Sequence, residues 1–342
     1  TQYTSSAASD VYKRQLYNPV SVSGYHIREA GSTAAQELAF TLNNGFAYIE
    51  ECLERGLKID NFAHRLSFFF NAHMDFFEEI AKYRAARRIW ANRLKNQYGA
   101  KNESSLKLKF HTQTAGCSLT AQQPENNIVR TALEAMSAVL GGTNSLHTNS
   151  LDETLALPSE KAAKIALRTQ QIIAFETGVP NVADPLGGSR YIEELTDKLE
   201  KQALKYFDEI HEMGGTVQAI EDGYFQKKIA ESASIYQESV DSKERIIVGV
   251  NDFIEQDEEL DIEILKISRD AQDTQEHKIK TLRKNRDEKI LQEKMKKLSD
   301  ACKNDLNLVP FLIEVAEQGG TVGEIVEVMK KVYGEWEESF GI

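Results

Sequence analysis

The chain has few cysteines, no long apolar run and no surplus of positive charge. Its three cysteines, Cys52, Cys117 and Cys302, are far apart and odd in number, which excludes a disulfide framework and does not match the spacing of a metal site. No apolar run approaches the roughly 18 residues of a membrane-spanning helix. No charged and then apolar leader opens the chain. We therefore expect a cytoplasmic protein with no membrane partner and no metal ligands of its own.

Acidic residues outnumber basic ones. There are 53 Asp and Glu against 41 Lys and Arg, so the net charge is -12 at pH 7. That balance argues against sequence-independent binding to nucleic acid. The length of 342 residues suffices for one large domain or two ordinary ones. Residues 1–15 are polar and carry no periodicity, so we expect a foreign or disordered tail there and a natural start that is missing.

From Val20 onward the sequence alternates between strand and helix patterns. Strands are expected at 20–24, 65–73, 105–114 and 143–149. Each is followed by an expected helix, at 32–56, 75–99, 124–142 and 159–178. Such units predict parallel strands with crossover helices, in either a doubly wound sheet or a (β/α)8 barrel. No glycine-rich phosphate fingerprint follows a strand, which disfavours the dinucleotide-binding fold, and four units are half of a barrel.

Reactive side chains gather where these strands end. His26, His73, His111 and His147 each lie at or just past the carboxyl end of a predicted strand, where barrels carry their sites. A single histidine is more often structural, but the same placement after four strands favours an active-site rim. The stretch 23–31 holds four functional side chains within five positions, and it reads either as this rim or as a solvated turn.

Two of the predicted strands have polar faces. Alternation places Arg65, Ser67 and Phe69 on one face, and it places His111 with Gln113. Packed barrel interiors favour Val, Ile and Leu instead. These faces therefore either line a wet channel, which would suit a long polar substrate arm, or are strand edges in solvent.

Four long segments, 17–42, 65–91, 110–158 and 183–196, closely resemble the catalytic subunit of the methylmalonyl-CoA mutase family, which includes isobutyryl-CoA and related acyl-CoA mutases. The resemblance implies an α/β fold: the C-terminal half of a (β/α)8 TIM barrel over 16–190, N-terminally truncated, followed by a helical C-terminal lobe over 191–342. It also implies that coenzyme A threads along the barrel axis and that a separate cobalamin-binding domain caps the barrel.

The resemblance implies catalytic roles in the first of these segments. Tyr25 matches the family tyrosine that sits between the substrate and the corrin. His26 matches the histidine that hydrogen-bonds the thioester carbonyl, where a donor steadies developing charge. Glu29 matches a residue at the corrin face. Arg28 has no matched role, and we expect a salt bridge within the turn.

Contacts to the acyl-CoA substrate are implied along the strands. The implied residues are Arg65, Ser67, His111, Gln113, Asn144 and Ser145. The fork-shaped guanidinium of Arg65 suits a phosphate of coenzyme A. Asn144 departs from the pattern, because the family usually has glutamine in the sequence GGTQSLHT, and the shorter amide would leave that contact to water.

The implied cofactor is adenosylcobalamin (coenzyme B12). Gly116 matches a close approach to the corrin, where a side chain would collide, and Asn149 and Glu153 match the pair that holds the adenosyl ribose. The cobalamin domain is marked by an Asp-x-His-x-x-Gly motif, but no glycine follows His277 in that spacing. We therefore expect the cobalt ligand to come from a separate domain or small subunit, which would be a partner of this chain.

The resemblance favours a coenzyme-B12-dependent acyl-CoA mutase of the methylmalonyl-CoA mutase type, an isomerase that rearranges the carbon skeleton of a CoA thioester by a radical 1,2 shift. The alternatives are an isobutyryl-CoA or related acyl-CoA mutase subunit, or a fragment that binds coenzyme A or the cobalamin subunit without turnover. We expect an oligomer, no nucleic acid, and no activity from this chain alone.

The last third predicts helices. Helical patterns cover 191–215 and 216–240, a short strand is expected at 245–251, and two more helices lie within 309–336. Residues 261–302 are highly charged and read as a solvated helical hairpin or, less favoured because sustained heptads are absent, as a partner-binding coiled coil.

Overall fold

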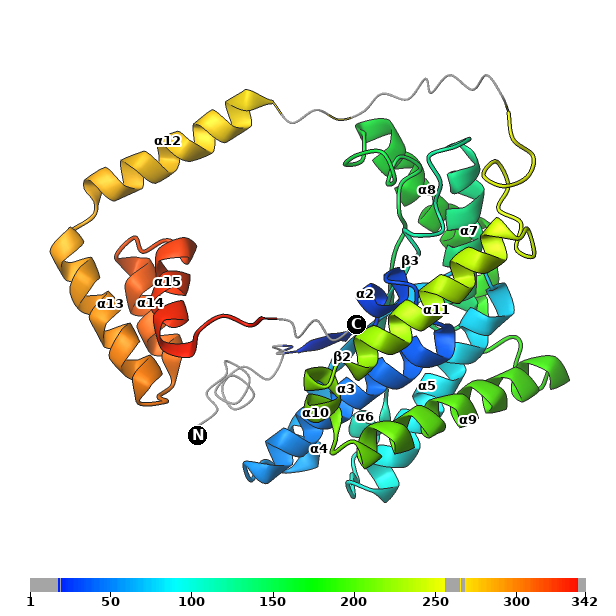
Figure 1. The fold of residues 1–342 in the computed structure, drawn as a ribbon, viewed down its shortest axis with the longest axis horizontal. Coiled ribbons are helices and arrows are strands. Elements are labelled where there is room, and N and C mark those ends of the chain that lie inside the picture. The colour runs from blue at the N-terminus through cyan, green and yellow to red at the C-terminus, as the bar shows by residue number, and fades with distance from the viewer. Residues whose placement is uncertain (1–17, 19, 256–264, 266–267, 338–342) are drawn as a thin grey trace. The chain divides into compact units, whose positions relative to one another are not determined.

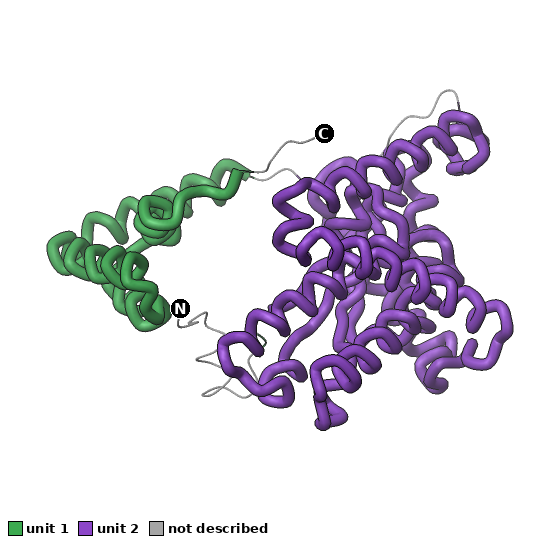
Figure 2. Tube along the Cα trace, turned by 60° about the horizontal axis from the view of Figure 1, so that its bottom comes forward, with its two compact units in different colours: residues 1–19, 266–338 green, residues 20–265, 339–342 purple. Residues whose placement is uncertain are grey.

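The computed structural model describes residue 18, residues 20–255, residue 265 and residues 268–337. These fall into two compact units (Figure 2). We call residues 20–265 the sheet unit and residues 266–338 the helical unit, and each is described by itself. The predicted boundaries at 15/16 and 190/191 stay predictions. Among the described residues, no helix is both long and apolar enough to cross a membrane.

The sheet unit is built on four parallel strands in sequential order. They are β1 (Ser21–Ser23), β2 (Ser67–Ala72), β3 (Phe110–Thr114) and β4 (Ser145–His147), each neighbouring the next (Figure 1). The α/β class and the parallel strand–helix units predicted from the sequence are thereby confirmed. β3 begins later than predicted because Asp60 binds the backbone of Lys101 and Asn102 and the hydroxyl of Ser105, which holds this stretch in a turn and a short helix.

Long helices connect the strands, close to the predicted ranges. They are α3 (Ala34–Glu54), α5 (Phe76–Asn96), α7 (Asn126–Leu140) and α8 (Glu160–Glu176). Thr33 and Gln36 form a capping box at the start of α3. The short elements were not predicted: α2 (Tyr25–Glu29), α4 (Ile59–Phe62), η1 (Ala63–Arg65), α6 (Glu103–Leu106) and η2 (Val179–Asn181).

One face of the sheet is apolar and carries the core. Phe68, Phe70 and Phe110 point to this face and are at most 2% exposed. The ring of Phe68 meets the indole of Trp90 from α5 edge-on, with centroids 5.0 Å apart, and Phe46 of α3 stacks on the same indole at 5.7 Å. Interlocked aromatic rings of this size supply most of the burial that holds helices on the sheet.

The opposite face of the sheet is polar across all four strands. The register aligns Ser23, Phe69, His111 and Ser145 in one row, and Asn71, Gln113 and His147 in the next. Residues in register share a face. The polar alternation predicted for β2 and β3 therefore belongs to one continuous surface and not to isolated strand edges.

Three further helices complete the sheet unit. They are α9 (Arg190–Glu212), which packs against α3 and α5, α10 (Thr216–Glu221) and α11 (Tyr224–Asp241). The single helix predicted over 216–240 is wrong, because Gly223 adopts a φ of +71° and breaks it. The strand predicted at 245–251 is also wrong: among the described residues there is only an isolated bridge between Val248 and Asp252. The Asn251 side chain binds the backbone of Ile247 and Val240, which folds this stretch into a turn.

The helical unit contains α12 (Arg269–Asn285), α13 (Glu288–Lys303), α14 (Leu308–Glu317) and α15 (Val322–Tyr333). α13 packs against α14 and α15 around a small core of Leu291, Met295, Leu298, Cys302 and Val315. The predicted hairpin over 261–302 lies partly outside the described residues. Within them, α12 buries no residue, and α13 packs on the two later helices instead.

Candidate active site

The rim predicted at 23–31 is a one-turn helix set on the carboxyl end of the sheet. Gly24 closes β1 by donating its backbone N–H to Phe69 O at 2.7 Å. A Cβ at Gly24 would lie 2.0 Å from the Thr41 hydroxyl, so only glycine allows α2 to start this close to α3. The turn was one of two readings of the sequence; the structure shows a helix that brings its side chains over the polar face.

Tyr25 and His26 gather around Phe69. The Tyr25 ring stacks on Phe69 with centroids 4.9 Å apart, and the His26 ring meets Tyr25 edge-on at 5.7 Å. Ser23 Oγ lies 2.9 Å from His26 Nδ1. When that hydroxyl donates to Nδ1, the imidazole carries its proton on Nε2 and can donate there to a ligand. Both predicted catalytic residues therefore stand together, and His26 is exposed.

The carboxylate of Glu29 fastens α2 to the loop after β3. It accepts hydrogen bonds from the backbone N–H groups of Gly116 (3.0 Å) and Cys117 (2.9 Å), and from Asn71 Nδ2 (2.6 Å). A Cβ at Gly116 would lie 3.0 Å from Glu29 Oε2 and 3.4 Å from the Tyr25 hydroxyl. A larger residue at Gly116 would displace these neighbours, and the predicted close approach of Gly116 to the corrin stays a prediction.

Gln113 and Asn149 link Tyr25 to this loop. Gln113 Nε2 donates to the Tyr25 hydroxyl at 2.9 Å and to Asn149 Oδ1 at 2.8 Å. Asn149 is almost fully buried, and its Nδ2 donates to Thr114 O at 2.9 Å. Burial, and then the charge of Glu29, raise the pKa of Tyr25, so the phenol keeps its proton at neutral pH. Five predicted residues, Tyr25, Glu29, Gln113, Gly116 and Asn149, therefore form one cluster, which we call the rim cluster.

Glu153 lies just beyond the rim cluster. With His147 and Gln170 it lines a cavity of about 210 Å³. Partial burial raises the pKa of its carboxyl, while His147 opposes the shift. Its charge acts on Tyr25 through space.

His111 and Ser145, two further predicted substrate residues, lie on the polar face in the row next to that of Asn71 and Gln113. His111 Nδ1 and Ser145 Oγ are 2.7 Å apart, and the His111 ring lies against Phe69 with centroids 5.0 Å apart. Burial, and then His147, lower the pKa of His111. Ser67 opens β2, whereas Arg65 ends η1 and so does not belong to the strand face as predicted.

Asn144 is engaged with the neighbouring strand. Its Oδ1 accepts from Phe110 N at 2.9 Å, and its backbone N–H donates to Phe110 O at 3.1 Å. The side chain thus extends the pairing of β3 with β4, a contact that sequence reasoning did not foresee.

The sequence analysis missed Asn71, although its alternation with Ser67 and Phe69 places it on the same face. Arg28 was expected to pair within its own turn, but it lies 3.9 Å from Glu79 of α5 and bonds Ser32 O. His73 is 8% exposed and accepts from Met74 N at 2.8 Å, which agrees with a structural histidine.

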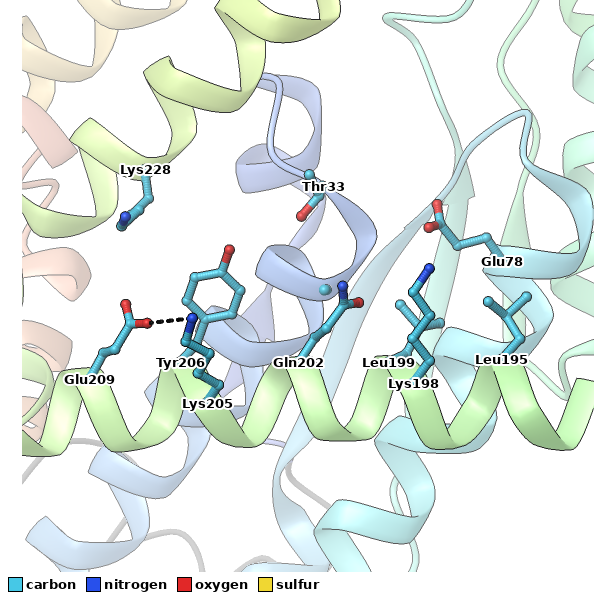
Figure 3. A pocket seen from close by; sticks show the side chains of 11 residues that line it. Thr33, Glu78, Leu195, Lys198, Leu199, Gln202, Lys205, Tyr206, Glu209 and Lys228 are labelled. Carbon is cyan, nitrogen blue, oxygen red and sulfur yellow. Dashed lines mark ion pairs between the residues drawn. The ribbon is translucent and has the colours of Figure 1, made fainter.

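The sheet unit also has a cavity of about 400 Å³ beside its helices (Figure 3). It lies along α9, and the start of α3, Glu78 of α5 and Lys228 of α11 also line it; three lysines and two glutamates are among its lining residues. None of the predicted site residues lines it. The polar face and the rim cluster are therefore the better candidate for the active site.

Comparisons with known proteins agree on one family. The family model described as methylmalonyl-CoA mutase matches residues 6–335. The chain is 46% identical over 324 residues to the 2-hydroxyisobutanoyl-CoA mutase large subunit of Aquincola tertiaricarbonis, covering 94% of this chain and 58% of that protein. It is also 46% identical to the methylmalonyl-CoA mutase of Rhizobium meliloti over 322 residues (94% and 45%) and to the mitochondrial methylmalonyl-CoA mutase of Homo sapiens over 321 residues (93% and 43%). The chain thus spans about half the length of the curated relatives it matches.

Proposed function

The chain belongs to the methylmalonyl-CoA mutase family, and we propose that it carries the substrate- and cofactor-facing half of a coenzyme-B12-dependent acyl-CoA mutase. The rim cluster supports this best. Five residues that the resemblance matches to catalytic, substrate-contact and cofactor positions, from three separate stretches of the sequence, meet at the carboxyl edge of a parallel sheet. The four strand–helix units are, in this proposal, one half of a (β/α)8 barrel, and the helical unit is the C-terminal lobe.

The rim cluster also fits adenosylcobalamin. Gly116 has room for no side chain beside Glu29, Asn149 and Tyr25, so its backbone lies directly among the residues that would face the cofactor. Glu29, Gly116, Asn149 and Glu153 would hold the group. The cofactor supplies homolysis of its cobalt–carbon bond and hence a radical; its cobalt ligand would come from another domain or subunit.

Within this proposal, Tyr25 and His26 act on the substrate. The raised pKa of Tyr25 keeps the phenol neutral, and stacking on Phe69 fixes the plane of its ring. His26 donates from Nε2 to the thioester oxygen in the tautomer in which the Ser23 hydroxyl donates to Nδ1. A donor aimed at an oxygen that gains charge during rearrangement lowers the barrier more than it strengthens binding.

The polar face supplies a route for the coenzyme A arm. From Ser67 to Asn71 it extends along β2 for about 13 Å at roughly 3.3 Å per residue. His111 and Ser145 lie midway, and their hydrogen bond offers a neutral polar surface to an amide-rich chain. Arg65, at the amino end, would meet a phosphate.

The proposal covers the methylmalonyl, isobutyryl and related acyl groups alike, because relatives named for different acyl-CoA substrates share the same 46% identity with this chain. One relative is named a large subunit, which supports a separate cobalamin-binding small subunit as partner. Oligomerisation, cytoplasmic location and lack of activity in this chain alone stay predictions; several relatives are named mitochondrial.

The test is His26→Ala in the full-length enzyme. Loss of one donor aimed at the reacting oxygen typically costs about a hundredfold in kcat, with a smaller change in KM. His64→Ala is the matched control, because His64 lies in η1 and has no assigned role. Kinetics and melting temperature are measured side by side. An unchanged kcat with a lowered melting temperature would show that His26 is only structural.

A further inference from the structure

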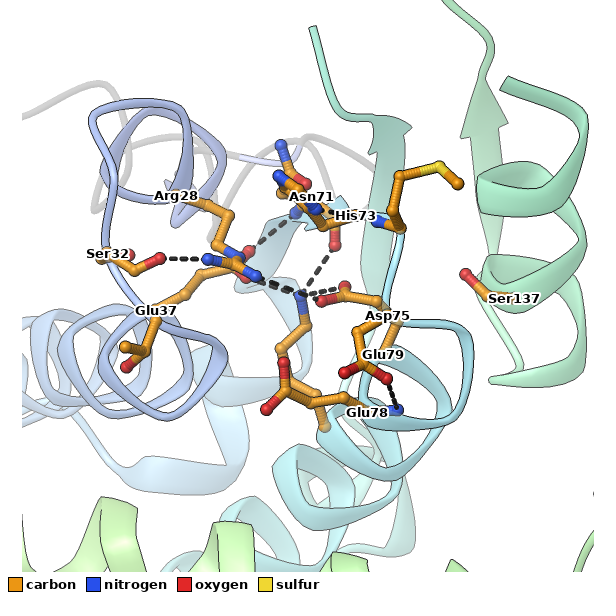
Figure 4. A network of polar contacts seen from close by, with 12 residues as sticks. Arg28, Ser32, Glu37, Asn71, His73, Asp75, Glu78, Glu79 and Ser137 are labelled. Atoms are coloured by element: carbon orange, nitrogen blue, oxygen red, sulfur yellow. Dashed lines mark hydrogen bonds and ion pairs between the residues drawn. The ribbon is translucent and has the colours of Figure 1, made fainter. Parts of the chain in front are cut away.

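Four charged side chains from three helices lie close together next to Asn71 of β2, and Figure 4 labels Arg28, Glu37 and Glu79 among them. The side chains of Glu37 (α3) and of Glu79 and Lys82 (α5) are fully buried, and Arg28 (α2) lies 3.9 Å from Glu79. We call these four residues the charge cluster. Its two cations and two carboxylates balance each other.

Lys82 is the centre of the charge cluster. Its Nζ donates to Glu37 Oε2 at 2.5 Å, to Asn71 O at 2.8 Å and to Glu79 Oε2. An ammonium group has three protons, so each has an acceptor. Burying ions costs free energy that apolar side chains of similar volume would not incur. Stability alone therefore gives no reason for charges at this place.

Asn71 connects the charge cluster to the rim cluster. Its backbone N–H donates to Glu37 Oε1 at 2.7 Å, and its backbone oxygen accepts from Lys82 and from the Tyr83 hydroxyl, the latter at 2.5 Å. Its side-chain Nδ2 then donates to Glu29 Oε1 at 2.6 Å. The main chain of Asn71 is thus held by Glu37, Lys82 and Tyr83, while its side-chain amide holds Glu29.

We propose that the charge cluster positions Glu29 through Asn71, and with Glu29 the backbone of Gly116 and Cys117. Glu37, Glu79 and Lys82 are positioning residues, because they reach the rim cluster only through others; Arg28, which precedes Glu29 on α2, supplies the second positive charge. As a statement about catalysis, this rests on the function proposed above. As a statement about geometry, it can be tested without any ligand.

The electrostatics of Glu37 agree with a role in positioning. Burial raises the pKa of its carboxyl to about 7, while Lys82 opposes the shift. Among the smaller effects, Glu79 raises this pKa and Arg28 lowers it. The carboxylate therefore depends on Lys82 to stay ionised at neutral pH. Removing Lys82 alone would leave two buried acids with one cation, so a charge-balanced change is the cleaner probe.

The probe is Glu37→Met/Lys82→Met, which removes one charge of each sign and two of the three contacts to the Asn71 backbone; the bond from the Tyr83 hydroxyl remains. Asn71→Ala keeps the charge cluster but deletes the amide that reaches Glu29. Leu94→Ala is the matched control: Leu94 is equally buried on α5 but lies in the apolar core. The readout is amide hydrogen exchange of Gly116 and Cys117 in the 342-residue chain, with the melting temperature recorded for each variant.

We expect the exchange of these two amides to rise at least tenfold in Glu37→Met/Lys82→Met and in Asn71→Ala. Adding Asn71→Ala to the double variant should give no further rise, because both changes break the same path. Leu94→Ala should lower the melting temperature without a selective rise at Gly116 and Cys117. If the double variant does not fold, Asn71→Ala decides: wild-type exchange at both amides overturns the proposal. A triple variant in which the rises in amide exchange from the double variant and from Asn71→Ala simply add would also overturn the proposal.

Kinetics of the full-length enzyme separate this proposal from the proposed function. Asn71→Ala should lower kcat about tenfold with little change in KM for the thioester, because an offset of the site geometry affects the reacting arrangement most. Faster exchange with unchanged turnover would support the geometric link and contradict the catalytic importance of Glu29. Unchanged exchange would overturn the link whatever the turnover.

Discussion

The sheet unit and the helical unit differ in how deeply they bury charge. The sheet unit buries Glu37, Glu79 and Lys82 completely. The helical unit packs an apolar core around α13, and its Arg286–Glu324 ion pair is only partly buried: the two side chains are 8% and 27% exposed and share two hydrogen bonds of 2.7 and 2.8 Å. Buried ions are a poor route to stability, whereas a small apolar core is a good one. The contrast is one of degree: among the described residues, the side chains of Glu37, Glu79 and Lys82 are fully enclosed next to Asn71, whose amide bonds Glu29 of the candidate site.

Lys82→Met should have the largest effect, and it tests whether the ions of the sheet unit are truly buried. It leaves Glu37 and Glu79 buried with too little positive charge, which typically costs about 3–5 kcal/mol. The free energy of unfolding of the sheet unit should fall by that amount in chemical denaturation followed by circular dichroism. Glu37→Met/Lys82→Met should recover much of the loss. A single variant within about 1 kcal/mol of wild type would mean that these ions are solvated and that the contrast between the units is false.

Leu298→Ala probes the other side of the comparison. Leu298 is fully buried in the helical unit, and removal of such a side chain costs about 2–4 kcal/mol because it leaves a cavity. Amide exchange should rise throughout α13, α14 and α15 and stay unchanged in α3 and α5. Faster exchange in α3 or α5 would show that the two units unfold together and cannot be compared as separate bodies.

The smallest expected effect is the response to pH. Hydrogen bonds from Arg286 lower the pKa of Glu324 to about 2, so its contribution to stability is present above the usual glutamate pKa of 4.5 and is lost as pH falls towards 2. Burial raises the pKa of Glu37 to about 7, so its contribution is greatest below pH 4.5 and is lost as pH rises through 7. Glu324→Gln should lower the free energy of unfolding of the helical unit by about 1 kcal/mol at pH 7. It should also reduce the loss of stability of this unit as pH falls below 4.5. Parallel pH trends in the two units would contradict this assignment.

The strand–helix pattern predicted His26, His111 and Gln113 at or just past strand ends, which converge in a parallel sheet, and the resemblance supplied Glu29 and Gly116. The structure has these residues at those places, while their roles stay predictions. The meeting of Glu29 with the backbone of Gly116 could not be read from the chain, because it depends on how closely α2 approaches the loop after β3.

The errors have local causes. Gly223 and Asn251 disrupted a predicted helix and a predicted strand, one through its positive φ and the other through its side-chain hydrogen bonds. The charge cluster could not be predicted from the sequence, for a different reason. Glu37, Glu79 and Lys82 lie in amphipathic helices where charge is ordinarily solvated, and only tertiary packing turns that face inward.

The indole of Trp90, stacked in the core of the sheet unit, has an optical consequence. The chain has two tryptophans: Trp90 is 1% exposed, and Trp336, in the helical unit, is 70% exposed. A buried indole fluoresces at shorter wavelength than a hydrated one, and it shifts to the red when water reaches it. Trp336 is already hydrated and contributes a nearly constant background. The emission colour of the unlabelled chain is therefore a reporter of the unit that holds the rim cluster.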